Sequence, residues 1–392
     1  MDRLRNRIQH YAWGSHSAIA ELCGRPSPSP EPEAELWLGA HPSAPSEIER
    51  DGVWRPLDSV IADDPARELG PRCVADLGSQ LPFLLKVLAA ARPLSLQAHP
   101  TLAQAAAGFD REAARGIPLD APNRSYRDRN HKPELICALS RFHALSGFRR
   151  VEQSRELFDE LGTPELDFAR EALAAGDVGL GPLFRGIMTL EPALRDRMVR
   201  ATLSACSRVV ERAGSFVDEC RWALRFGQLY ANDAGVVSAL LLNLVVLQPG
   251  EAIYLPAGNL HAYLEGTGVE IMASSDNVLR GGLTPKHVDV EELCSVLRFE
   301  SGDVEIRRPA ISGAEARYET PTREFRLSRI QGAADLAAHG PEIVLCTAGA
   351  VTVASGEATL ALGRGQSAFV SAGDGSYQVS GPGTLFRATT GA

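Results

Sequence analysis

Alternation of apolar and polar residues predicts β-strands in the first third of the chain. Residues 83–88 form an apolar run with Lys86 embedded in it, and after a turn the chain returns through residues 94–99. Since a buried Lys is rare without a partner, Lys86 is expected to point outward or toward a polar cavity. Successive side chains of a strand point to opposite faces, so one face of the returning strand carries Ser95, Gln97 and His99. A polar row between apolar neighbours is typical of a strand that lines a lumen.

A second buried strand is predicted over residues 131–139. Lys132, Glu134 and Ile136 share one face of it. A Lys and a Glu that face one way in a buried strand need a partner, a metal or water, because burying an unpaired charge is costly. Pro133 cannot donate to a strand ladder, which places this strand at a sheet edge or a barrel mouth.

The β-segment richest in polar chemistry spans residues 249–287. Ile253 and Leu255 alternate as in a half-buried strand, and a turn follows them. The segment then carries an imidazole, two carboxylates and two cations, namely His261, Glu270, Asp276, Arg280 and Lys286. A structural role explains any one of these residues but not all of them together, so a functional site is predicted here.

Helical spacing of apolar residues predicts an inserted helical region over residues 151–229. Gly162, Gly176 and Pro192 divide it into four or five helices. It contains no G-x-G-x-x-G or G-x-x-x-x-G-K-[ST] motif, so it is not interpreted as a nucleotide domain. Further helices are predicted over residues 101–115 and 288–298.

The remainder of the chain is β-rich and contains an internal echo. The spacing of residues 250–261 is repeated at residues 365–376, with Ser376 in the place of His261. This repeat predicts two related β-barrels, of which only the first keeps a metal ligand. The predicted division is a metal-binding barrel over residues 1–149 and 230–300, a helical domain over 150–229, and a C-terminal β-domain over 301–392.

Composition narrows the possible partners and compartment. The 392 residues carry a formal net charge of -9, which argues against nucleic acid or acidic lipid as the main partner. The chain has no run of 18 apolar residues, and its first residues lack the apolar core of a signal peptide. Its seven scattered cysteines, without a C-x-x-C spacing, are interpreted as buried thiols in a reducing cytoplasm. We therefore expect a cytoplasmic protein, and we expect it to be a monomer.

Three of the predicted strands can bring a metal site together inside one barrel. Two imidazoles, a carboxylate and an amide oxygen are suited to Zn²⁺ or another borderline divalent cation, the residues being Gln97, His99, Glu134 and His261. The competing interpretation, a hydrogen-bonded polar network, does not explain the cations predicted nearby, Lys86, Lys132, Arg280 and Lys286. A divalent metal beside several cations indicates an anionic, oxygen-rich ligand such as a phosphorylated small molecule.

Several segments together carry a family resemblance that extends from the first residues to about residue 295. They are YAWGS, ELWLGAHPSAPS, LPFLLKVLAAARPLSLQAHP, HKPEL and YLPAGNLHAYLEGTGVEIMASSDNVLRGGLTPK. In sequence and spacing they resemble type I mannose-6-phosphate isomerases (phosphomannose isomerases). The resemblance implies a mainly β fold of cupin-like jelly-roll barrels, one binding metal and one degenerate, with an inserted helical domain. It also implies one Zn²⁺ per chain and interconversion of mannose 6-phosphate and fructose 6-phosphate, which serves GDP-mannose metabolism.

The resemblance also implies roles for individual residues. It assigns the metal to the same four residues, a catalytic role to Arg280, and places in the pocket Lys132, Asp276, Glu270 and Lys286. Trp13 matches an aromatic pocket wall, and the candidates for the phosphate are Lys86, Ser95 and Lys286. The proton-transferring base stays open among Asp276, Glu270 and Lys132. One departure is Glu265, which stands where cupins commonly have an Asn.

Alternative functions remain open on the sequence. A cupin isomerase of another sugar phosphate and a non-catalytic zinc cupin that binds sugar both fit the same residues. An iron oxygenase with two His and one carboxylate is disfavoured, because Gln97 would crowd a position that O₂ needs. With no nucleotidyltransferase-like Gly-rich segment in the chain, a single activity is expected.

Overall fold

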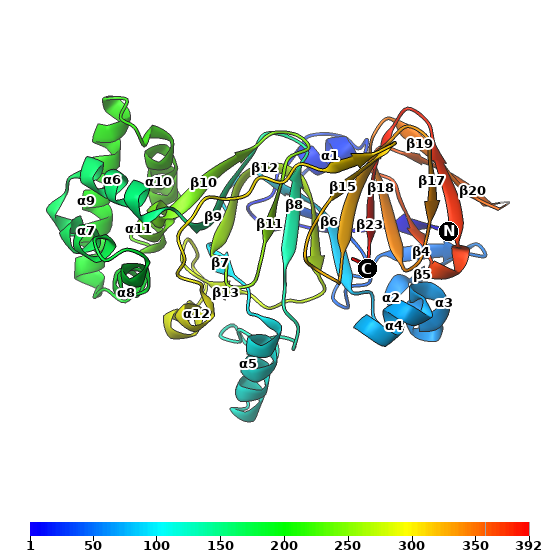
Figure 1. Cartoon of the computed structure of the whole chain (residues 1–392), viewed down its shortest axis with the longest axis horizontal. Helices are drawn as coiled ribbons and strands as arrows, with labels where there is room; N and C mark the ends of the chain where they lie inside the picture. The colour runs from blue at the N-terminus through cyan, green and yellow to red at the C-terminus, as the bar shows by residue number, and fades with distance from the viewer. Residues whose placement is uncertain (357, 392) are drawn as a thin grey trace.

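The computed structural model describes residues 1–356 and 358–391 as three parts arranged in a row. A helical group lies at one end, a β-barrel occupies the centre, and a second set of packed strands lies at the other end (Figure 1). The predicted mainly β fold with a helical insertion is therefore confirmed.

The central barrel is built from strands that run in the order β10-β9-β12-β6-β3-β2, with four short strands beside this path. The bounds are β2 (Arg7–Gln9), β3 (Glu35–Leu38), β6 (Phe83–Ala90), β7 (Gln97–Ala98), β8 (Glu134–Ala138), β9 (Phe142–Phe148), β10 (Leu242–Leu247), β11 (Ala252–Leu255), β12 (His261–Ala273) and β13 (Leu279–Arg280). The long β12 pairs with β6, β8 and β9 and so connects most of the barrel strands. Apolar residues such as Leu88, Ile136 and Tyr263 pack together inside it.

The strand predicted over residues 94–99 is much shorter in the structure. Only Gln97 and Ala98 form β7. The Leu94 amide donates to Tyr263 O at 2.9 Å, whereas the Leu96 amide donates to Gly282 O at 3.1 Å. Because the two amides bond different segments, the chain is extended here without a continuous ladder. The strand predicted from residue 131 likewise begins only at Glu134, after Pro133, which has no amide hydrogen to donate.

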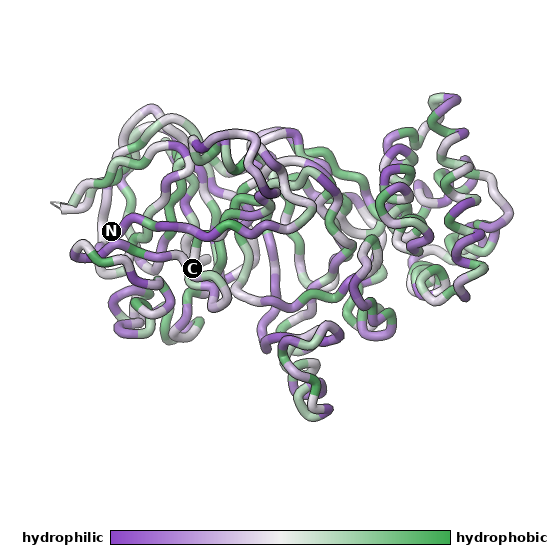
Figure 2. The backbone as a smooth tube through the Cα atoms, turned by 180° about the vertical axis from the view of Figure 1, so that it is seen from behind, coloured by the Kyte–Doolittle hydropathy of each residue, from purple (hydrophilic) through white to green (hydrophobic). Residues whose placement is uncertain are grey.

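The helical insertion is confirmed. Residues 151–229, all of which the structure describes, form five α-helices, which are α6 (Val151–Leu161), α7 (Asp167–Leu173), α8 (Asp177–Met188), α9 (Pro192–Glu211) and α10 (Val217–Leu229). The short α11 (Gly235–Ser238) follows them. Hydrophobic and hydrophilic stretches alternate along these helices in Figure 2, as in amphipathic helices that share a core. Two predicted helices outside this group are also present as α5 (Leu102–Ala114), which Thr101 caps, and α12 (Val290–Val296).

The C-terminal strands form two further sheets. One runs β14-β15-β16-β23-β18-β21 and continues into β1-β4-β5 from the start of the chain, and the other runs β17-β22-β19-β20. The bounds are β1 (Asp2–Arg5), β4 (Glu47–Arg50), β5 (Val53–Pro56), β14 (Ala310–Ser312), β15 (Glu315–Tyr318), β16 (Arg326–Gln331), β17 (Ala334–Ala337), β18 (Glu342–Ala348), β19 (Ala350–Ser355), β20 (Ala358–Gly363), β21 (Ser367–Val370), β22 (Ser376–Ser380) and β23 (Thr384–Thr389). Because β1 pairs with β21, hydrogen bonding crosses the boundary predicted at residue 300. The predicted division into domains stays a prediction.

The internal echo corresponds to the same local structure in both halves. In each copy a strand of four residues, β11 or β21, is followed by a turn and a longer strand. His261 and Ser376 are the first residues of that longer strand, in β12 and β22. The short helices α1 (Ala18–Leu22), α2 (Leu57–Asp63), α3 (Pro65–Leu69) and α4 (Pro71–Leu77) lie beside these sheets.

Other sequence expectations concern cysteines and membranes. All seven cysteines are free thiols, and Cys73, Cys137, Cys206, Cys220 and Cys346 are buried. Across the described residues, no helix combines the length and apolar character that crossing a membrane requires.

Candidate metal and substrate site

Three buried side chains from separate segments meet at one end of the central barrel. His99 directly follows β7, Glu134 begins β8, and His261 begins β12. The His99 Nε2 atom lies 3.3 Å from Glu134 Oε1, and the His261 Nε2 atom lies 3.3 Å from Glu134 Oε2. One ligand atom from each of the three residues lies within 4.8 Å of the others. Their spacing and donor chemistry fit a divalent cation.

Hydrogen bonds on the far side of each ring fix how the imidazoles face the cluster. His99 Nδ1 lies 2.7 Å from the Asn277 carbonyl oxygen, and His261 Nδ1 lies 3.0 Å from the Asn259 carbonyl oxygen. A carbonyl can only accept, so each Nδ1 donates and each ring turns its Nε2 atom toward Glu134.

The electrostatics of the cluster test whether it suits a cation. Burial and the nearby Lys132 lower the pKa of His99 to about 4, so this ring is neutral at pH 7. Its buried Nε2 has no hydrogen-bond partner among the described residues. Burial alone would raise the pKa of Glu134, but Lys132 and His99 outweigh it and hold the pKa well below its usual range. The Nε2 lone pair of the neutral His99 ring repels the Glu134 carboxylate unless a positive charge lies between them, so these residues fit a metal.

Gln97 lies on the same face as this cluster. It is the cross-strand partner of His261 on β12 and of Arg280 on β13, and directly opposed residues in antiparallel strands share a face. Gln97 Nε2 donates to Ser95 Oγ at 3.3 Å, which leaves the amide oxygen available for a cation. Ser95 therefore orients Gln97 in the structure.

A buried ion cluster centred on Lys86 lies further inside the barrel. Lys86 Nζ lies 3.4 Å from Glu35 Oε2 and 3.3 Å from Glu270 Oε2, and the ammonium is 5.3 Å from the Trp37 ring centroid. Burial lowers the pKa of Lys86, but the two carboxylates outweigh burial and raise it overall. Burial raises the pKa of Glu270 despite the opposing effect of Lys86. Lys86 thus points inward to buried carboxylates and not outward, which was the other position considered for it.

Lys132 and Asp276 lie beside the metal-type cluster with different partners. Lys132 Nζ is 2.9 Å from Glu134 Oε1, and the lysine is 8% exposed. Asp276 Oδ1 is 3.3 Å from His41 Nε2, and the bond to His41 lowers the pKa of this carboxyl despite partial burial. At 48% side-chain exposure, Asp276 is the acidic group here that remains open to a ligand.

Three cations lie near one another at the rim of the site. Burial and Arg127 lower the pKa of Arg280, and burial, Arg280 and Arg127 lower the pKa of Lys286. No carboxylate forms an ion pair with any of the three among the residues that the structure describes. Asn277, fully buried, holds their two loops together, since its Oδ1 accepts from the Arg127 amide at 2.7 Å and its Nδ2 donates to the Asp128 carbonyl at 2.9 Å.

Comparison with known proteins identifies the family of this chain. Residues 1–151 match the family model described as phosphomannose isomerase type I, catalytic domain, and residues 324–390 match mannose-6-phosphate isomerase, cupin domain. The mannose-6-phosphate isomerase of Escherichia coli K12 is 38% identical, over 99% of each chain. The chain belongs to the type I phosphomannose isomerase family.

Solved structures of relatives superpose over the whole chain. A mannose 6-phosphate isomerase from Salmonella typhimurium, bound to its substrate fructose 6-phosphate and to zinc, has a TM-score of 0.92 and 36% identity, covering 100% of this chain and 99% of that one. A zinc-bound holo mannose 6-phosphate isomerase has a TM-score of 0.90 and 36% identity, covering 99% of each chain. The resemblance inferred up to residue 295 therefore extends through the C-terminal β-domain.

The structure shows the contacts of two further residues from the sequence analysis, Trp13 and Glu265. Trp13 is half-buried, packs against the apolar interior of the barrel, and stacks on Tyr11 with ring centroids 5.7 Å apart. Glu265, the departure from the cupin pattern, forms an ion pair with Arg225 of α10. It therefore joins the barrel to the helical group and takes no part in the buried cluster.

Several residues of the site were not singled out in the sequence. Glu35 and His41 contact predicted residues from other segments, and Asn277 and Arg127 position or extend the cation group. Glu35 carried a detectable signal, because an acidic residue in the apolar strand Glu35–Leu38 requires a partner. Arg127 lies in a polar loop among other basic residues, where no local pattern distinguishes it.

Proposed function

We propose that this protein is a zinc-dependent aldose–ketose isomerase that interconverts mannose 6-phosphate and fructose 6-phosphate. The observation that carries the proposal is the buried His99–Glu134–His261 cluster beside three cations; within the described part of the chain, His99 Nε2 has no hydrogen-bond partner and the three cations form no ion pair with a carboxylate. Membership of the type I phosphomannose isomerase family supports the choice of substrate, as do relatives whose structures hold zinc and fructose 6-phosphate.

The residues proposed to hold the zinc are Gln97, His99, Glu134 and His261. When bound there, Zn²⁺ supplies a Lewis acid that polarises the carbonyl of an open-chain sugar and orients its hydroxyls. Lys132 lies next to Glu134, which places an ammonium group at the edge of this group of ligands. The carbonyl bonds to both His Nδ1 atoms keep the rings in the tautomer that such binding requires.

The phosphate of the substrate is proposed to bind at Arg280, Lys286 and Arg127. Guanidinium groups bind phosphate in a bidentate manner, and a dianion would offset the burial and the repulsion from neighbouring cations that lower the pKa of Arg280 and Lys286. Lys86 and Ser95 stay predictions for phosphate contact. A phosphate would have to compete with Glu35 and Glu270 for Lys86, and with Gln97 for Ser95.

The reaction moves a proton between two adjacent sugar carbons through a cis-enediol(ate). Asp276 is proposed as the base, because it is exposed and its lowered pKa keeps it in the ionised form that accepts a proton. His41 orients that carboxylate. Arg280 lies across β13 and β7 from Gln97 and would stabilise the charge that develops on the enediolate oxygen. Glu270 and Lys132 remain alternative bases, the former held by Lys86 and the latter by Glu134.

We also propose that the protein acts in the cytoplasm as a monomer with one zinc ion per chain, and that it supplies or consumes mannose for GDP-mannose. Size-exclusion chromatography with light scattering tests the monomer, and cell fractionation tests the location.

A coupled assay on mannose 6-phosphate tests the proposed activity. We expect turnover with zinc, its loss with chelator, and its return when zinc is added back. Glucose 6-phosphate and ribose 5-phosphate serve as competing substrates, and the variants Gln97→Ala and Arg280→Ala serve as site controls. Zinc-loaded protein that leaves mannose 6-phosphate unchanged refutes the proposal, and preferred turnover of another sugar phosphate changes the substrate while keeping the chemistry.

A further inference from the structure

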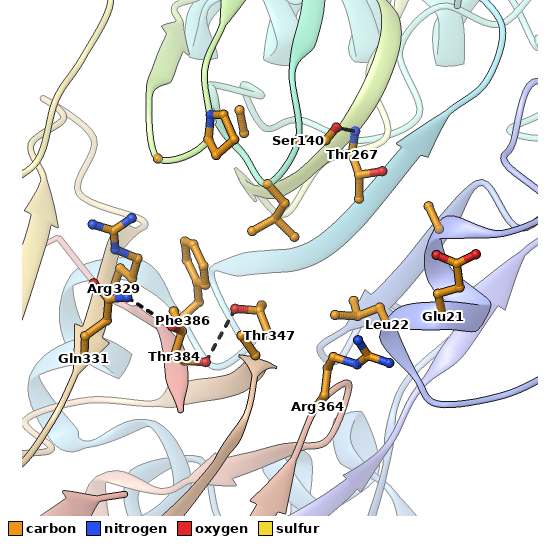
Figure 3. A pocket seen from close by; sticks show the side chains of 16 residues that line it. Glu21, Leu22, Ser140, Thr267, Arg329, Gln331, Thr347, Arg364, Thr384 and Phe386 are labelled. Carbon is orange, nitrogen blue, oxygen red and sulfur yellow. Dashed lines mark hydrogen bonds between the residues drawn. The ribbon is translucent and has the colours of Figure 1, made fainter. Parts of the chain in front are cut away.

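A cavity of about 450 Å³ lies away from the metal-type cluster, between the central barrel (the first barrel) and the C-terminal sheets of β14–β23 (the second barrel). The first barrel contributes Gly250, Ser140 and Thr267, the second contributes strands β16, β18 and β23, and α1 closes one side (Figure 3). Its volume lies within the range of small-molecule sites in proteins. None of its lining residues belongs to the proposed active site.

Two guanidinium groups face this cavity without a counter-ion. Arg329 of β16 and Arg364, in the turn before β21, lie on opposite sides of it in Figure 3. Neither side chain forms an ion pair or a hydrogen bond with any residue that the structure describes. The Arg329 Nε atom is buried and unpartnered. An unpaired guanidinium in such a place is unfavourable, and a bound anion would offset that cost.

Gly250 lies directly beside the Arg329 guanidinium. A side-chain Cβ built at Gly250 would lie 2.9 Å from Arg329 Nη1, the flexible end of the arginine. Gly250 also has a φ of 88°, which favours glycine, and its carbonyl accepts from the Tyr318 hydroxyl at 2.8 Å. Gly250 and the Arg329 guanidinium therefore line the same part of the cavity wall.

The other lining groups suit a hydroxylated small molecule. Thr347 and Thr384 present hydroxyls, and Phe386 presents an aromatic surface between the two arginines in Figure 3. Glu21 also lines the cavity, but its Oε1 accepts from the Ser27 hydroxyl at 3.0 Å. The cavity thus combines an unpaired cation on one wall with hydroxyl and apolar surface next to it.

We propose that this inter-barrel cavity is a second ligand site, which binds the phosphate group of a small phosphorylated molecule at Arg329. Arg364, exposed on its turn, adds positive potential from the opposite wall. The cavity also touches the chain of the candidate active site, because Ala138, at its edge, ends the strand that Glu134 begins. Four residue steps of about 3.3 Å separate Ala138 from Glu134, which is about 13 Å along β8.

Equilibrium dialysis of the zinc-loaded full chain with radiolabelled inorganic phosphate tests the site. Arg329→Gln is expected to weaken one class of phosphate binding at least tenfold, and Arg364→Gln to weaken it about threefold. Arg200→Gln, which removes an exposed arginine of α9 outside any such cavity, should change nothing. The difference between the unmodified protein and Arg329→Gln measures only the phosphate binding that depends on Arg329. Phosphate bound at the proposed active site is the same in both proteins and does not affect this difference.

Further measurements keep the result interpretable. Arg329→Gln should retain the isomerase turnover of the unmodified protein, which shows that it folds; should it fail to fold, Arg364→Gln on the exposed turn decides the question. Repeating the dialysis with labelled glucose 6-phosphate distinguishes the source of the phosphate, since tighter Arg329-dependent binding indicates a phosphorylated metabolite and equal binding indicates free phosphate. Phosphate binding that is unchanged in Arg329→Gln, or reduced equally in Arg200→Gln, overturns the proposal.

Discussion

Replacing Lys86 by Met removes the cation from a buried cluster of carboxylates and tests why that lysine is there. Glu35 and Glu270 are 7% and 2% exposed, and each has an oxygen within 3.4 Å of the ammonium. Met has nearly the volume of Lys, so the substitution leaves little cavity and isolates the electrostatic effect. The variant therefore buries two carboxylates that have lost their cation.

The magnitude follows from these distances. At an effective dielectric constant of about 20, each contact at 3.4 Å contributes about 5 kcal/mol of Coulomb energy. Repulsion between the two carboxylates and the desolvation of all three groups offset much of this sum. Removing one partner of a buried pair costs about 3–5 kcal/mol in practice, and we expect about 3 kcal/mol here because one carboxyl can take up a proton.

Urea unfolding followed by tryptophan fluorescence measures the effect. The midpoint should fall by about 1 M for a loss of that size. Lys286→Met, at an exposed lysine without a carboxylate partner, should change the stability by less than about 0.5 kcal/mol. Adding Glu270→Gln to Lys86→Met should restore more than half of the loss, because a single carboxylate then remains. A loss below about 1 kcal/mol, or no rescue by the second substitution, would refute the interpretation of Lys86 as the counter-ion of this cluster.

Three further predictions concern the substrate site and the second barrel. Arg280→Gln should lower kcat by about 10²–10³ without changing the zinc content, because it removes charge stabilisation of the enediolate; an unchanged kcat would exclude that role. Arg127→Gln should raise KM for mannose 6-phosphate about tenfold with little change in kcat, as expected for a group that holds the phosphate equally in substrate and transition state. Burial raises the pKa of Glu315, but hydrogen bonds from Arg317 and Ser328 outweigh burial and lower this pKa overall. The ionised Glu315 carboxylate therefore stabilises the folded protein fully above the pKa of about 4.3 that it has in the unfolded chain, and this stabilisation is lost as the pH falls through the lower pKa of the folded state. Glu315→Gln should accordingly be less stable at pH 7 and lose less stability between pH 5 and pH 2 in thermal unfolding, and parallel curves for the two proteins would contradict this.

The sequence was most informative where local periodicity determines the outcome. Strand alternation predicted that Lys132 and Glu134 share a face, and the structure places the two charged groups 2.9 Å apart although β8 begins only at Glu134. His261 and Ser376 could be matched because the two turns have the same spacing and the same glycine before the first strand. The helical insertion was predictable for the same reason, since each helix carries its own apolar stripe.

Contacts between segments distant in the sequence could not be predicted from local periodicity. Lys86 required a partner, and Glu270 lay within the predicted site, but Glu35 reaches Lys86 through the pairing of β3 with β6. The pairing of β1 with β21 likewise joins the two ends of the chain, and no pattern in either strand specifies it. The predicted strand over residues 94–99 failed because Leu94 and Leu96 bond different segments, which periodicity does not reveal. The positions of Arg127 and His41 beside the site depend on loops that Asn277 and Asp276 hold.

X-ray absorption at the zinc edge, on the purified full chain and on His99→Ala and His261→Ala, tests the central claim most directly. We predict one zinc ion per chain in the unmodified protein, surrounded by nitrogen and oxygen with scattering from two imidazoles, and loss of most of the metal in either variant. Sulfur in the coordination sphere, or full zinc occupancy with an unchanged spectrum after both histidines are replaced, would contradict it.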